Sequence, residues 1–199
     1  TARFLASESG CKVTGIDLTP EFVETGRVLC SWVGLAERIE LHCGSALATP
    51  FEADQFDAAV MLHVGMNIQD KASLFAEVNR VLKPGGVFGV YDVMRQNDDP
   101  LIYPVPWAMV PDASALGTPE EYRNALTSSG FEITTERDRG DFADEFFARL
   151  RKNMEASGGP PPLGLHILLG DDGPVKIRNM VENVTAGRVS PVEMIARKK

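Results

Sequence analysis

Strand-like and helix-like patterns alternate along the first half of the chain, and this alternation limits the fold more than any other feature of the sequence. An apolar stretch at 12–16 precedes a helical pattern at 19–33, and the strand-like "RIELHCG" and "QFDAAVMLHV" precede the helical "DKASLFAEVNRVL" and the strand-like "VFGVYDVM". Strands joined through helices run parallel, and such a sheet is covered by helices on both faces. We therefore expect an α/β fold with a doubly wound, mostly parallel sheet.

The second half of the chain changes in character. In "TPEEYRNALTSSGFEITTERD", Thr118 followed three residues later by Glu121 predicts a helix that begins with a capping box, and Gly130 predicts its end. Helices expected at 141–153 and 171–186 form an insertion before the last strand, "RVSPVEMIARK". Pro191 near the start of that strand favours a position at the edge of the sheet.

Composition and length fit one globular domain. The 199 residues are 44% hydrophobic and 24% charged, which is enough apolar material for a full core. We expect a single domain, 1–199. Its parts are a strand and helix core at 1–95, a loop at 96–117, a helix and strand at 118–140, the helical insertion at 141–187 and the last strand at 188–199.

Charge and hydropathy argue against several partners. The net charge of -8 disfavours nucleic acid, which needs clustered basic residues, and no apolar run approaches the roughly 20 residues of a membrane span. The first residues also lack the pattern of a secretory signal, so we expect a soluble, cytoplasmic protein. Cys11, Cys30 and Cys43 are widely spaced, which predicts buried free thiols rather than a metal site or a disulfide framework.

The printed chain begins within a recognisable unit. Phe4 and Leu5 fit the back half of a helix, Gly10 fits a turn, and the strand at 12–16 ends at Asp17. This is the second half of a βαβ unit without its first strand. An acid at the carboxyl end of the second strand of a doubly wound sheet can accept hydrogen bonds from two ribose hydroxyls.

Three segments carry a family resemblance: "GIDLTPEF", "LATPFEADQFD" and "RVLKPGG" at 80–86, in this order. The last combines a helix end, a proline that stops the helix and two glycines able to adopt positive φ. Together they resemble class I S-adenosylmethionine-dependent methyltransferases, especially the small-molecule branch with the quinone-biosynthesis and glycine/sarcosine N-methyltransferases. The resemblance covers about residues 1–95 and weakly "TPEEYRNALTSSGFE". It implies a Rossmann-like fold with an antiparallel last strand, and S-adenosyl-L-methionine as cofactor.

The resemblance also implies the roles of individual residues. Asp17 would bind the ribose hydroxyls and Leu18 would pack on the adenine. The adenine edge would contact Ser45, where many relatives have an acid, and Ala46. Leu62 and His63 would line the methionine portion and face the substrate.

One motif of the family is missing. Its glycine-rich loop follows the first strand, and the printed sequence starts after that loop. In the family's order the first strand lies between the second and fourth, so its removal leaves a gap of about 10 Å, two strand spacings. We therefore expect the printed chain to be a fragment of a longer product, with a cofactor site that is impaired when this fragment stands alone.

Methyl transfer needs alignment of the reacting groups more than a catalytic triad or metal. His63 is the first candidate for a general base and His166 the second, although His63 also fits a core histidine. In "LIYPVPWAMVPD", Tyr103 and Trp107 could form an aromatic wall for a cationic methylated amine, or simply cover the core. Met66 and Asn67, shortly after His63, are expected to lie on the same substrate side, as part of the wall or as contacts of the acceptor.

The sequence thus predicts methyl transfer to a small-molecule acceptor, an amine or a hydroxylated cyclic compound. Two alternatives stay open. Asp17 would also suit the ribose of a nicotinamide-dependent dehydrogenase of Rossmann type, and the chain could be a truncated, non-catalytic binding module. The identity of the acceptor and self-association into a homo-oligomer are not determined by the sequence.

Overall fold

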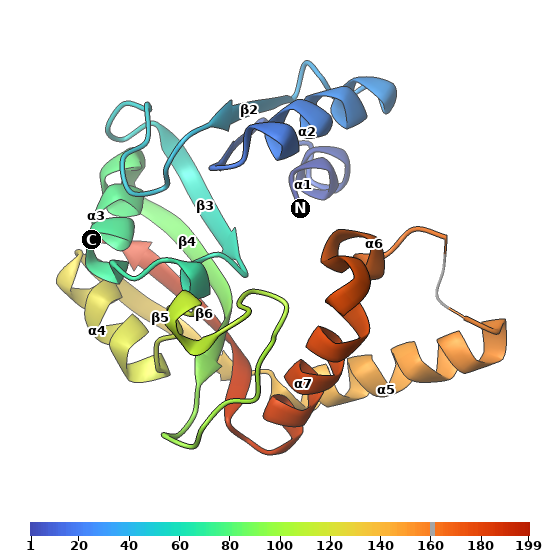
Figure 1. The fold of residues 1–199 in the computed structure, drawn as a ribbon. Coiled ribbons are helices and arrows are strands. Elements are labelled where there is room, and N and C mark those ends of the chain that lie inside the picture. The colour runs from blue at the N-terminus through green and yellow to red at the C-terminus, as the bar shows by residue number, and fades with distance from the viewer. Residues whose placement is uncertain (160–161) are drawn as a thin grey trace. The chain divides into compact units, whose positions relative to one another are not determined.

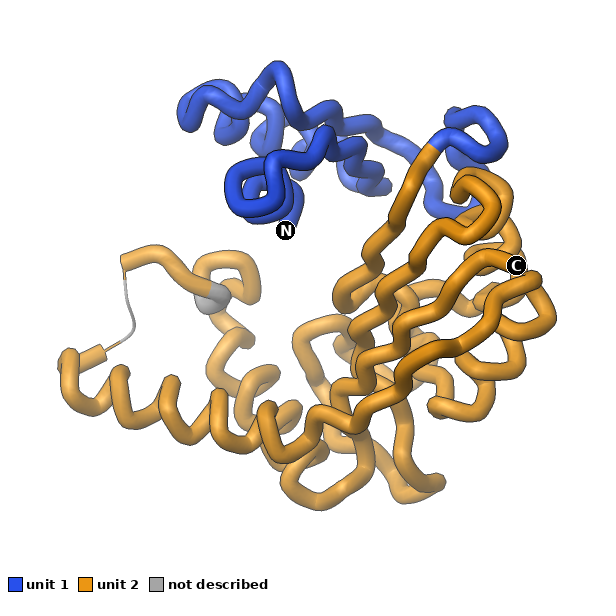
Figure 2. Tube along the Cα trace, turned by 180° about the vertical axis from the view of Figure 1, so that it is seen from behind, with its two compact units in different colours: residues 1–55 blue, residues 56–199 orange. Residues whose placement is uncertain are grey.

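The structure is a computed structural model that describes residues 1–159 and 162–199, with only the main chain at 165 and 166. This part of the chain forms two compact units, Thr1–Gln55 and Phe56–Lys199 (Figure 2). Helices alternate with strands in both units, and paired strands up to residue 95 run parallel. The expected mixed α/β fold with a mostly parallel sheet is confirmed.

The first unit is a small parallel pair of strands with two helices. Its elements are α1 (Ala2–Glu8), β1 (Val13–Asp17), α2 (Pro20–Trp32) and β2 (Ile39–Cys43). In the register of the pair, Val13 lies opposite Ile39 and Asp17 lies opposite Cys43. Ala6, Cys30 and Ile39 form the buried cluster that joins α1 and α2 to the strands. Both strands therefore end at the same edge of this unit.

The second unit is a four-stranded sheet with its own helices. Its elements are β3 (Phe56–Leu62), η1 (Gly65–Asn67), α3 (Lys71–Val81), β4 (Leu82–Arg95), η2 (Pro111–Ala113), α4 (Pro119–Ser128), β5 (Phe131–Asp138), α5 (Gly140–Ser157), α6 (Leu165–Leu169), η3 (Gly170–Asp172), α7 (Gly173–Thr185) and β6 (Val189–Lys198). The strand order is β3-β4-β6-β5, and β6 is antiparallel to both of its neighbours (Figure 1). The expected antiparallel last strand is confirmed, as is the helical insertion between β5 and β6.

An aromatic core holds the sheet of the second unit to α3 and α4. Phe75 of α3 packs against Phe88 of β4 and Tyr122 of α4, with ring centroids 5.9 and 5.7 Å apart. Phe88 in turn contacts Phe131 of β5 at 5.6 Å. All four side chains are at most 1% exposed. Such rings supply much of the apolar burial that stabilises a core, so this cluster anchors the sheet.

Local signals in the sequence form the elements that they predict. The Thr118 hydroxyl accepts a hydrogen bond from the Glu121 N–H at 3.2 Å, and the Glu121 carboxylate accepts one from the Thr118 N–H at 2.7 Å. This is the predicted capping box of α4. Near the start of β4, Gly85 has φ +75°, a conformation that favours glycine. A Cβ on the next residue, Gly86, would lie 2.8 Å from the carbonyl oxygen of Lys83.

Two expectations about single residues are wrong. Pro191 is not on an edge strand, because β6 lies between β4 and β5. The Pro191 carbonyl accepts a hydrogen bond from the Arg139 N–H at 2.8 Å, and Arg139 is the residue after the end of β5. The nitrogen of Pro191, which has no hydrogen to donate, faces this same side, where β5 has already ended. Of the three cysteines only Cys30 is buried: Cys11, two residues before β1, and Cys43, the last residue of β2, are exposed.

The described strands form two separate sheets. In residues 1–159 and 162–199, β1 pairs with β2 only and β3 pairs with β4 only. Over the same residues, no helix combines the length and the apolar character needed to cross a membrane.

Candidate cofactor and acceptor sites

The carboxyl ends of β1 and β2 bring together four residues of the first unit. Asp17 is the last residue of β1, and its Oδ1 accepts a hydrogen bond from the Thr19 N–H at 2.8 Å. This bond orients the carboxylate, which is exposed at the end of the strand. Leu18 follows with 73% of its surface exposed. An oriented carboxylate beside an exposed apolar side chain can bind a vicinal diol and an adjacent flat ring.

The loop after β2 lies at the same edge. The Gly44 N–H donates to the Asp17 carbonyl at 2.9 Å, which places the start of the loop against the end of β1. The Ser45 hydroxyl accepts from the Leu47 N–H at 3.1 Å and retains its own proton for donation, and Ala46 is half-buried. The structure therefore groups Asp17, Leu18, Ser45 and Ala46 at the carboxyl ends of β1 and β2.

In the second unit, Leu62 and His63 lie at the carboxyl end of β3. Leu62 is opposite Tyr91 of β4 and is 42% exposed. His63 has φ +56°, which is uncommon for a residue other than glycine, and its N–H donates to the Tyr91 carbonyl at 2.8 Å. Its ring meets the Tyr91 ring edge-on at 5.1 Å. Neighbouring protein groups displace water from the imidazole, which lowers the pKa of His63.

Behind His63, a buried carboxylate fixes the next turn of the chain. Asp92 of β4 is fully buried, and its Oδ2 accepts hydrogen bonds from the Met66 N–H at 3.0 Å and the Tyr122 hydroxyl at 2.8 Å. Among the described residues its Oδ1 has no hydrogen-bond partner. Met66 itself is 6% exposed and packs in the interior, whereas Asn67 is exposed. The turn of η1 is thus tied to the sheet through Asp92.

Burial and charge act against each other in this cluster. Desolvation raises the pKa of Asp92 to about 6, against the opposing effects of its hydrogen bonds and of the Lys71 ammonium. The same desolvation lowers the pKa of Lys71 and raises that of Tyr122. Lys71 Nζ donates to the carbonyls of Ile68 at 2.6 Å and Ala115 at 2.7 Å. It therefore joins the turn after η1 to the segment that precedes α4.

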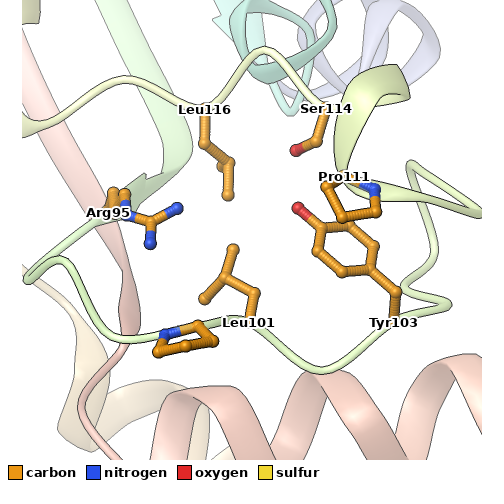
Figure 3. A pocket seen from close by; sticks show the side chains of 7 residues that line it. Arg95, Leu101, Tyr103, Pro111, Ser114 and Leu116 are labelled. Atoms are coloured by element: carbon orange, nitrogen blue, oxygen red, sulfur yellow. The ribbon is translucent and has the colours of Figure 1, made fainter.

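A pocket of about 320 Å³ lies in the loop that follows β4. Figure 3 shows the side chains that surround it: Arg95, Leu101, Tyr103, Pro111, Ser114 and Leu116. Trp107 lies behind this wall: its indole N–H donates to the Ser114 hydroxyl at 3.0 Å, and its ring packs against a core cluster that includes Met66 and Val93. The side chain of His166 lies outside the described part of the chain.

Four residues of this region were not expected from the sequence: Lys71, Asp92, Arg95 and Tyr122. For Asp92 a signal exists, because an acid interrupts the apolar "VFGVYDVM" in the middle of a strand. For the others the sequence offers no signal, because Tyr122 and Lys71 bond to residues 30 and 44 positions away, and the pocket at Arg95 is closed by residues later in the chain. In the described residues, no three His, Cys, Asp or Glu side chains are grouped to hold a metal ion.

Comparison with known proteins finds methyltransferases among the relatives of this chain. The family model "Methyltransferase domain" matches residues 1–90. A sarcosine/dimethylglycine N-methyltransferase of Halorhodospira halochloris is 28% identical over 161 residues, which are 80% of this chain and 57% of the relative. A sterol 24-C-methyltransferase of Eremothecium gossypii is 31% identical over 150 residues, 72% of this chain and 40% of the relative. The chain thus spans about half the length of these two curated relatives.

Solved structures share the fold. A Galdieria sulphuraria protein provisionally described as a sarcosine dimethylglycine methyltransferase superposes with a TM-score of 0.80 at 21% identity, over 100% of this chain and 74% of that one. The geranyl diphosphate C-methyltransferase of Streptomyces coelicolor, solved with Mg²⁺, geranyl diphosphate and S-adenosyl-L-homocysteine, gives 0.74 at 18% identity, over 96% and 63%. The methyltransferase model over residues 1–90, the shared fold and these relatives together support a class I S-adenosylmethionine-dependent small-molecule methyltransferase.

Proposed function

We propose that this protein transfers a methyl group from S-adenosyl-L-methionine to a small-molecule acceptor. The observation that carries the proposal is the position of Asp17. Its carboxylate is exposed at the carboxyl end of β1, and the Thr19 N–H orients it through one oxygen, which leaves the other for a ligand. In a doubly wound sheet this position serves the ribose of a nucleoside cofactor.

The residues of the first unit fit the adenosine part of this cofactor. Asp17 would accept hydrogen bonds from the ribose hydroxyls, and the exposed Leu18 would cover one face of the adenine. Ser45 would donate its hydroxyl proton to the adenine edge beside Ala46, a weaker contact than the carboxylate of many relatives would make. The cofactor supplies the methyl group on a sulfonium sulfur, and the protein supplies orientation and exclusion of water.

His63 is suited to remove a proton from the acceptor. Because its pKa is lowered, the imidazole is neutral at neutral pH and can accept a proton. The bond from its N–H to the Tyr91 carbonyl fixes its main chain at the end of β3. We therefore propose His63 as general base and Leu62 as a wall of the methionine portion.

The acceptor is proposed to be an amine or a hydroxylated cyclic compound. Tyr103, Trp107, Met66 and Asn67 are the proposed contacts, with His166 from the insertion. The names of the relatives include acceptors with nitrogen and with carbon as the methylated atom, so they do not select one class. A cytoplasmic location and a homo-oligomeric state also stay predictions.

Isothermal titration of S-adenosyl-L-homocysteine into the protein extended upstream through the expected first strand and glycine-rich loop tests the proposal. We expect micromolar affinity, and for Asp17→Asn, which keeps the shape but removes the charge, a loss of about tenfold or more, since hydrogen bonds to charged groups contribute about 1.5–3 kcal/mol. Glu24→Gln is the matched control, because it removes an exposed carboxylate from α2 of the same unit. Its affinity should equal that of the wild type.

Two results would contradict the proposal. Binding of a nicotinamide dinucleotide in place of S-adenosyl-L-homocysteine would favour the dehydrogenase alternative. Absence of binding by either would favour a module without a cofactor.

A further inference from the structure

The pocket beside β4 gathers hydrogen-bond donors within apolar walls. The guanidinium of Arg95 and the hydroxyls of Tyr103 and Ser114 all point into it, and Leu101 and Leu116 close it from two sides (Figure 3). Arg95, Tyr103 and Ser114 are half-buried. A charge in such surroundings is less well solvated than on an open surface and interacts more strongly with an opposite charge.

The positive charge of Arg95 is held in place but not neutralised. Its Nε and Nη2 donate to the carbonyls of Asn97 at 2.9 Å and Asp99 at 2.8 Å. No carboxylate of the described residues forms an ion pair with it. A guanidinium has five N–H donors, so donors remain for a ligand after these two bonds. An oxyanion in the pocket would supply the missing counter-charge.

The two hydroxyls add donors for the same ligand. Ser114 Oγ already accepts the Trp107 indole N–H at 3.0 Å, so the proton that it still carries can be donated. Tyr103 lies across the pocket from Arg95, with its hydroxyl directed inwards (Figure 3). Three donors and one net positive charge match a carboxylate, whereas a di- or triphosphate carries more negative charge than one guanidinium neutralises.

The pocket is built before a ligand arrives. Asn183 of α7 donates to the Ile102 carbonyl at 2.9 Å and accepts the Ile102 N–H at 3.0 Å, and Asn179 donates to the Pro104 carbonyl at 2.9 Å. The main chain is therefore fixed on both sides of Tyr103. Between Ser114 and Leu116, the Ala115 N–H donates to the Met66 carbonyl at 2.9 Å. A preformed site binds without the entropic cost of ordering its loops.

We propose that the Arg95 pocket binds the carboxylate of the methyl acceptor, so that the acceptor is a small carboxylic acid. This rests on the proposed function, because it assigns the pocket to that reaction. It changes the expected role of Tyr103: a guanidinium in the same pocket repels a cation, so Tyr103 contacts the anionic end of the acceptor and not an ammonium group.

The test uses benzoate and benzamide, which share a shape and differ in charge. The readout is the indole N–H signal of Trp107 in a heteronuclear NMR spectrum, because that proton is bonded to the pocket residue Ser114. The signal of Trp32, an exposed residue of α2, serves as internal reference. We expect saturable shifts of the Trp107 signal with benzoate and none with benzamide. Equal shifts with both compounds would overturn the proposal, as would saturation by inorganic phosphate but not by benzoate.

Substitutions assign the effect to Arg95. Arg95→Gln should weaken benzoate binding at least tenfold, Arg95→Lys should weaken it less, and Tyr103→Phe should weaken it severalfold. Arg197→Gln is the matched control, because that guanidinium also donates to a main-chain carbonyl, that of Gly85 at 2.7 Å, and does not line the pocket. Unchanged binding by Arg95→Gln would overturn the proposal. If that variant fails to fold, Arg95→Lys and Tyr103→Phe carry the same test.

Titration of S-adenosyl-L-homocysteine and of benzoate into the upstream-extended protein separates the two proposals. Binding of S-adenosyl-L-homocysteine without binding of benzoate refutes the carboxylate site alone. Binding of benzoate without it refutes the methyl transfer, and with it the assignment of the pocket to an acceptor.

Discussion

Asp92 is a single buried residue that fixes the chain next to the proposed site. It lies in the middle of a buried strand, yet it receives hydrogen bonds from the turn of η1 and from α4. A methyl group on Gly65 would lie 2.5 Å from Asp92 Oδ2 and 2.7 Å from the Tyr122 hydroxyl, so the turn is packed closely against this pair. The position of the segment after His63 therefore depends on a carboxylate that is itself fully buried.

The pKa of Asp92 predicts a pH dependence of stability. Its value of about 6 in the folded protein exceeds the ordinary 3.8, so the folded state binds more protons than the unfolded state between these values. The free energy of unfolding should therefore fall as the pH rises from about 4 to about 6, by roughly 3 kcal/mol from this group. Asp92→Asn cannot ionise and should lack this loss.

Urea denaturation of both proteins at pH 4.5 and pH 7.5 measures the difference. The exposed Asp98→Asn variant should behave like the wild type. A loss in Asp92→Asn as large as in the wild type would show that other groups cause it.

His63 allows a test of the general base without strain on the backbone. Its φ of +56° would disfavour most replacements, but asparagine tolerates this region. His63→Asn should therefore fold normally and lose about 10²–10⁴-fold in kcat, the usual contribution of a general base. Because the pKa of His63 is lowered, wild-type activity should persist below the usual histidine range. An acid limb near or above pH 6.5 would contradict this role.

At the scale of elements, α4 depends on a short sequence signal. Thr118→Ala removes one half of the capping box and should lower the free energy of unfolding by about 1 kcal/mol. Thr127→Ala changes the same residue type at an exposed position of the same helix and should have an effect within about 0.5 kcal/mol. Thermal denaturation of the pair compares them. Equal losses would mean that the box contributes nothing beyond ordinary surface substitution.

The sequence could predict the features that depend on residues close together in the chain. Thr118 and Glu121 are three residues apart, and the turn at Gly85 immediately follows its helix, so local rules identify both. The proposed ribose-binding position of Asp17 is likewise local, because Asp17 is the last residue of β1. Arg95 could not be found in this way, because its partners are main-chain carbonyls and its pocket is closed by residues up to 21 positions later. Pro191 was misplaced because strand order is a property of the whole sheet.

For the whole molecule, the two units should differ in local stability. β4 and β6 each have a neighbour on both sides, and Val90 and Met194 within them are fully buried. β1 and β2 form a sheet of two strands, a size that is marginally stable by itself. Native-state hydrogen exchange should therefore show slower amide exchange in β4 and β6 than in β1 and β2. Equal exchange rates in the two sheets would contradict the view that the number of strands in a sheet determines how readily it opens.

The hydrogen bonds between α7 and the loop after β4 affect how the pocket could evolve. Asn183 and Asn179 bind only main-chain atoms of the loop, those of Ile102 and Pro104. Side chains at Leu101 and Tyr103 could therefore be exchanged while the path of the loop is kept. Mutations could therefore alter which compound the pocket binds while the main chain around it keeps its position.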